Sequence, residues 1–79
     1  MDASIRQRLE DLLTQLHLHR EASPAAGGAH DEVRAALDQE SAGGLRDRLE
    51  SYAVDLETSH PSLGVLVRGL VDELSSMGI

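Results

Sequence analysis

The sequence predicts an all-α fold of three to four antiparallel helices, packed as a helical hairpin, bundle or coiled coil. Leu, Ala, Glu and Arg dominate the composition, and these residue types favour helix. Tyr52 is the only aromatic residue, and β-branched residues are few outside Val65, Val67 and Val71, so strands have little support. Apolar residues recur at the helical spacings of three and four along several segments.

The first helix is expected over residues 4–21. Asp2 or Ser4 could cap its start, because a short side-chain oxygen satisfies a free backbone N–H there. One narrow apolar stripe, suited to a single neighbouring surface, runs along it and consists of Ile5, Leu9, Leu12, Leu13 and Leu16. Residues 22–30 are expected to form a flexible Pro/Gly linker, because Pro cannot continue a helix and two Gly residues follow it.

A short second helix is expected over residues 31–40, and whether it is ordered in the free chain stays open. Its apolar residues, Val33, Ala36 and Leu37, share one face. Ser and Gly residues at 41–44 break the chain again. The third helix is expected over residues 45–58, where the spacing of the first helix recurs in Leu45, Leu49, Tyr52, Ala53 and Leu56.

The fourth helix is expected over residues 61–77 and has the widest apolar face. Pro61 suits a first helical turn, where its missing N–H is not needed. Ser59 or His60 would cap the helix, so Ser59, His60 and Pro61 form a predicted helix corner. The apolar residues span an arc of about 140°, and they are Leu63, Leu66, Val67, Leu70, Val71, Leu74 and Met77. A face this wide predicts two or more neighbours and is the candidate interaction face. Gly64 could allow close approach to the preceding helix.

The small size of the chain favours a second subunit. Seventy-nine residues make one domain whose core is marginal alone. The chain has no Cys, which excludes disulfides and thiolate metal sites. We therefore expect a homodimer, although another protein could equally occupy the wide helix face.

The net charge of −7 restricts the partners further. An acidic chain repels phosphate backbones and anionic membranes, so we expect no nucleic-acid and no membrane partner. The longest apolar run, residues 63–71, is too short for a membrane span and contains Arg68. The N-terminus lacks the basic and apolar pattern of a signal peptide, and a cytoplasmic location is expected.

No catalytic motif is present, so we expect no enzymatic activity, no cofactor and no metal. The Gly pairs at 27–28 and 43–44 lack the Lys of a phosphate-binding loop. His17 and His19 diverge on a helix and cannot share a metal; His19 lies at the edge of the apolar stripe, as a packing residue or a pH-sensitive contact. The expected role is a non-enzymatic interaction or structural module.

Two alternatives remain open. Glu57 and His60 have the Glu-x-x-His spacing of di-iron helix bundles, but one copy would need a dimer axis to complete a metal site. An acidic decoy of a nucleic-acid-binding protein would need its carboxylates on one face, whereas here they are spread over all the predicted helices.

The C-terminal third carries a family resemblance. Its distinctive parts are the corner Ser59-His60-Pro61-Ser62-Leu63 and the ending Met77-Gly78-Ile79. These resemble a small bacterial family catalogued as domain of unknown function 4404. The whole chain matches that family's order of segments, in which a Leu-rich helix, an acidic variable stretch and an amphipathic helix precede the corner. The resemblance implies a small helical bacterial protein, brings no activity or cofactor with it, and directs attention to the corner.

Overall fold

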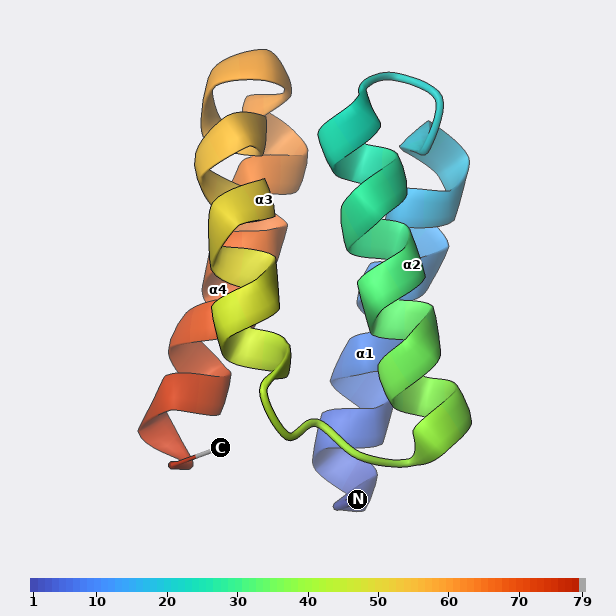
Figure 1. Cartoon of the computed structure of the whole chain (residues 1–79), viewed down its shortest axis with the longest axis vertical. Coiled ribbons are helices and arrows are strands. Elements are labelled where there is room, and N and C mark those ends of the chain that lie inside the picture. The colour runs from blue at the N-terminus through green and yellow to red at the C-terminus, as the bar shows by residue number, and fades with distance from the viewer. Residues whose placement is uncertain (79) are drawn as a thin grey trace.

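The computed structural model describes residues 1–78, which form an antiparallel four-helix bundle. The helices are α1 (Ala3–His19), α2 (Pro24–Gln39), α3 (Leu45–Ser59) and α4 (Pro61–Ser76). Each helix runs opposite to the one before it, with α2 and α3 in front of α1 and α4 (Figure 1). The predicted all-α bundle is confirmed. Contacts are densest between α3 and α4 and sparsest between α1 and α4, among the four neighbouring pairs.

The first helix follows the prediction closely. Asp2 caps α1, because its Oδ1 accepts a hydrogen bond from the Ser4 backbone N–H at 2.7 Å. Four residues of the predicted stripe, Ile5, Leu9, Leu12 and Leu16, are buried, and Leu13 is half-buried. The stripe therefore faces the core of the bundle, as its spacing indicates. The expectation of a single neighbouring surface is wrong, because α1 contacts both α2 and α4.

The predicted flexible linker at residues 22–30 is wrong, because most of it is the first half of α2. The Ser23 hydroxyl accepts a hydrogen bond from the Ala26 N–H at 3.2 Å, and Pro24 occupies the first turn, where it is tolerated. Gly28 packs against α3: a Cβ there would lie 2.8 Å from Cζ of Tyr52. This close approach explains a glycine inside the helix, and α2 is correspondingly longer than the predicted 31–40.

The third and fourth helices meet at a tight corner. His60 ends α3, where its backbone N–H bonds to Leu56 O, and it also precedes the first residue of α4. Its side chain does not cap α4. Gly64 lies against the end of α3, since a Cβ there would stand 2.7 Å from the Glu57 nitrogen. The close approach suggested for Gly64 is thus confirmed.

The core consists of aliphatic side chains from all four helices. Its largest fully buried members are Ile5, Leu9, Leu16, Val33, Leu45, Leu49, Leu56, Leu63, Val67, Leu70 and Leu74. In the described part of the chain, no helix has both the length and the apolar character that crossing a bilayer requires.

Candidate interaction surface

The predicted interaction face of α4 divides into two groups. Its buried members are Leu63, Val67, Leu70, Val71 and Leu74, which lie in the core shared with the other helices. Leu66 and Met77 stay exposed, at 45% and 46%. The prediction that this helix touches two or more neighbours is confirmed, because α4 contacts both α3 and α1. Most of its width is therefore covered within the chain, and only a narrow strip is free for a partner.

The predicted corner brings together residues that are distant in sequence. Ser59 donates its hydroxyl hydrogen to the Asp55 carbonyl oxygen at 3.0 Å, inside the last turn of α3. The His60 ring lies next to His19 at the end of α1, with 5.2 Å between the ring centroids. The two imidazole rings thus lie where the corner meets the end of α1. No sequence pattern relates His19 to His60, because the pairing depends on how the ends of the bundle meet.

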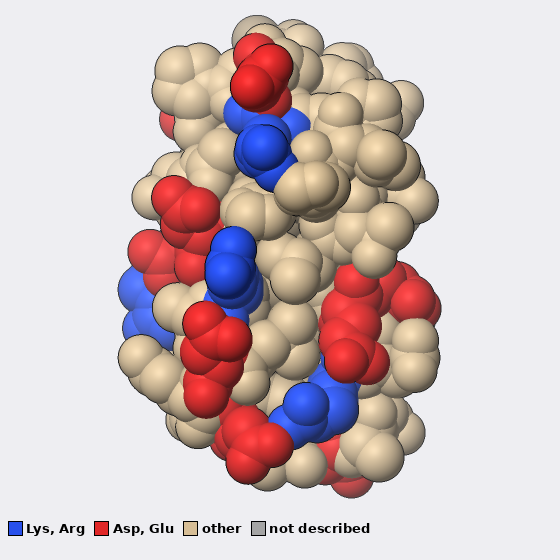
Figure 2. All heavy atoms as spheres, turned by 90° about the vertical axis from the view of Figure 1, so that its right-hand side faces the viewer, with Lys and Arg blue, Asp and Glu red and all other residues tan. Residues whose placement is uncertain are grey.

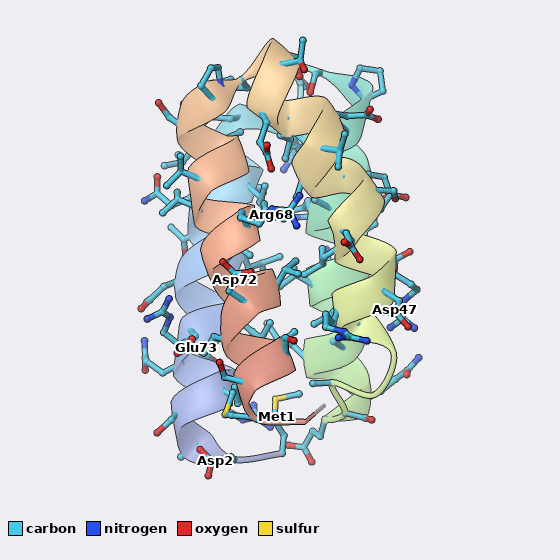
Figure 3. All side chains as sticks on the ribbon, turned by 90° about the vertical axis from the view of Figure 1, so that its left-hand side faces the viewer. Met1, Asp2, Asp47, Arg68, Asp72 and Glu73 are labelled. Carbon is cyan, nitrogen blue, oxygen red and sulfur yellow. The ribbon has the colours of Figure 1, made fainter. Side chains whose placement is uncertain are left out.

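The two residues of the metal-binding alternative have different partners. Glu57 Oε1 accepts a hydrogen bond from Arg68 Nε at 3.0 Å, whereas His60 contacts His19. Arg68 projects between α4 and α3 (Figure 3), and its guanidinium also lies 3.9 Å from Glu50. Within residues 1–78, no three metal-binding side chains converge. Glu57 therefore forms an ion pair with Arg68, and this pair joins α3 to α4.

A groove separates α1 from α4 on the side where their contact is sparse. Its volume is about 390 Å³. Its lining residues are Arg8, Asp11, Leu12, Thr14, Gln15, Leu66 and Leu70. Leucines from both helices supply the apolar part, and polar residues of α1 supply the rest. The exposed Leu66 of the predicted face therefore lies in a hollow that a neighbouring side chain could fill.

The surroundings of the groove carry both signs of charge. Arg8 Nε lies 3.3 Å from Glu73 Oε2, an ion pair from α1 to α4, although Glu73 Oε2 has no well-aligned hydrogen bond within residues 1–78. Glu73 stands on the side of α4 toward α1 in Figure 3. Asp11 Oδ1 accepts a hydrogen bond from Gln7 Nε2 at 3.0 Å. On the α1–α2 side of the molecule, acidic and basic groups also alternate (Figure 2).

Comparison with known proteins identifies the family. A search of curated proteins and a search of solved structures gave no match. A family model described as "Domain of unknown function (DUF4404)" matches residues 1–79. This match covers the Leu-rich first helix as well as the corner and the C-terminal ending that carry the resemblance in the sequence. The four-helix bundle therefore belongs to the DUF4404 family, a domain whose function is unknown.

Proposed function

We propose that this chain is a non-enzymatic interaction module of the cytoplasm that forms a homodimer through the groove between α1 and α4. The observation that carries the proposal is Leu66, a large apolar side chain that is 45% exposed beside a groove of about 390 Å³. Covering it would remove apolar surface from water, which is the main favourable term in protein association. The bundle has other surface hollows, but this groove is the one in which an exposed leucine of the predicted α4 face lies.

The charged residues of the groove and the small size of the domain favour a second copy as the occupant. Arg8 and Asp11 line the same groove from α1. A two-fold interface is self-complementary, so it can set Arg8 of one copy against Asp11 of the other. The net charge of −7 opposes self-association, but salt near 0.15 M screens that repulsion over roughly 8 Å. A domain this small also gains proportionally more from a second subunit.

The test is sedimentation equilibrium of the wild type, Leu66→Asp and Val54→Asp. Val54 is a matched control, because it is 55% exposed on α3 and receives the same charge. Burying an aspartate at a dimer contact should weaken the dimer at least thirtyfold, equivalent to about 2 kcal/mol. Val54→Asp should leave the dimer constant close to that of the wild type.

Two outcomes would contradict the proposal. A wild type that stays monomeric up to about millimolar concentration, where association is worth only some 4 kcal/mol, would exclude a functional homodimer. Equal weakening by both variants would mean that added negative charge acts generally and that the groove is not the contact. Circular dichroism of each variant would show that the helices are retained.

A further inference from the structure

Two arginines stand apart from the other five. Within residues 1–78, ion pairs to carboxylates are formed by Arg6, Arg8, Arg46, Arg48 and Arg68. Arg20 and Arg34 have no carboxylate within 4 Å in that range, although the chain holds fourteen acids and seven basic residues. Both side chains are exposed, so their guanidinium groups are accessible to a ligand from solution.

Both arginines belong to one cluster between the end of α1 and the first half of α2. Arg34 lines a hollow of about 270 Å³ together with Leu13, Thr14, His17 and His30. The His17 and His30 ring centroids are 5.6 Å apart. Arg20 extends the cluster, since its Nη1 contacts His17 and lies 3.2 Å from the Nε2 of that ring. One guanidinium and two imidazoles thus line this hollow, and a second guanidinium, that of Arg20, contacts the His17 ring from the neighbouring hollow.

His30 is the buried polar residue among those that line the hollow. It is 7% exposed, and its Nδ1 lies 3.3 Å from Asp31 Oδ1. Within residues 1–78, no protein hydrogen bond reaches its Nε2. Its Nε2 is not fully buried and is free to contact a ligand in the hollow.

Two acids lie near the cluster without forming ion pairs with its arginines within residues 1–78. Asp31 has a side chain that is 84% exposed and contacts only the His30 ring among the cluster residues. Glu21 lines a neighbouring hollow with His17, Leu18 and Arg20, but forms no ion pair with Arg20. Within residues 1–78, neither arginine of the cluster is therefore held by a carboxylate.

We propose that the hollow formed by Arg34, His17 and His30, with Arg20 at its edge, binds a small oxyanion of the phosphate class. Guanidinium groups match the geometry of phosphate oxygens and donate charge-assisted hydrogen bonds to them. Imidazole N–H groups can donate as well. A volume near 270 Å³ suits a phosphate group or a small phosphate monoester rather than a larger ligand. This hollow lies between α1 and α2, whereas the dimer groove lies between α1 and α4, and the two have no charged lining residue in common. Neither proposal depends on the other.

The test is titration of the whole protein with inorganic phosphate at constant ionic strength, followed by calorimetry and by the NMR signals of the His17 and His30 rings. A second titration with glycerol phosphate distinguishes free phosphate from a monoester as the preferred ligand. Variants Arg34→Gln and Arg20→Gln remove one guanidinium each. Because both residues lack ion pairs within residues 1–78, these changes should leave the fold intact. The matched control is Arg46→Gln on α3, which makes the same charge change away from the hollow.

We expect one phosphate-class ligand to bind and to move both ring signals. Losing one charge-assisted hydrogen bond should raise Kd about tenfold or more in Arg34→Gln, and the control should bind like the wild type. Two results would overturn the proposal: no binding of either probe, or equal weakening in Arg34→Gln and Arg46→Gln. The second result would mean that phosphate responds only to overall charge.

Discussion

Two glycines of α4 illustrate how a single position can be constrained by its surroundings or free of them. At Gly64, a Cβ would stand 2.7 Å from the nitrogen and 2.9 Å from Cα of Glu57, so the backbones of α3 and α4 meet there. At Gly69, a Cβ would find nothing within 4 Å. Gly64 is therefore required by the corner between the two helices, whereas Gly69 only lowers the helix propensity of α4.

The two glycines should respond in opposite directions to alanine. Gly64→Ala should destabilise the fold by about 1–3 kcal/mol, because the added methyl overpacks two backbones that cannot both move. Gly69→Ala should stabilise it by up to about 1 kcal/mol through helix propensity. Urea unfolding followed by circular dichroism measures both. Equal effects of the two substitutions would show that α3 and α4 do not approach closely at Gly64.

At the scale of the element, the sequence predicts helix ends well where a local signal is decisive. Pro61 marks the start of α4, and the gap at residues 41–44 correctly separates α2 from α3. The start of α2 is missed because Pro24 is also a good first-turn residue, and because two glycines resemble a linker. The ring of Tyr52 on α3 leaves no room for a Cβ at position 28, which explains the glycine inside α2, and no local pattern can reveal that contact.

The Ser23 cap tests the corrected start of α2. Ser23→Ala removes the acceptor for the Ala26 N–H and should cost about 1 kcal/mol of stability. Ser51→Ala is the control, since Ser51 lies exposed inside α3 and its hydroxyl bonds only to the carbonyl of Arg48. Chemical denaturation would compare the two. If residues 22–30 were a flexible linker, Ser23→Ala would leave the stability unchanged.

At the scale of the whole molecule, the wide apolar face of α4 shows both the reach and the limit of sequence reasoning. The width correctly predicts more than one neighbour, because five of its residues are buried in the bundle. Periodicity does not say that those neighbours are α1 and α3 of the same chain. The groove that leaves Leu66 exposed depends on how far α1 stands from α4, and the hollow lined by Arg34 depends on α1 and α2 meeting at His17 and His30. Both features are set by tertiary packing.

The proposed homodimer places two copies of the chain against each other at the α1–α4 groove. Intermolecular nuclear Overhauser effects in a mixture of isotope-labelled and unlabelled protein test it most directly, because they report only contacts between copies. We expect such contacts from the Leu66 methyl groups to α1 residues that line the groove, including Leu12 and Thr14. Intermolecular contacts at Val54 on α3 instead, with none at Leu66, would place the interface elsewhere and contradict a dimer at the groove.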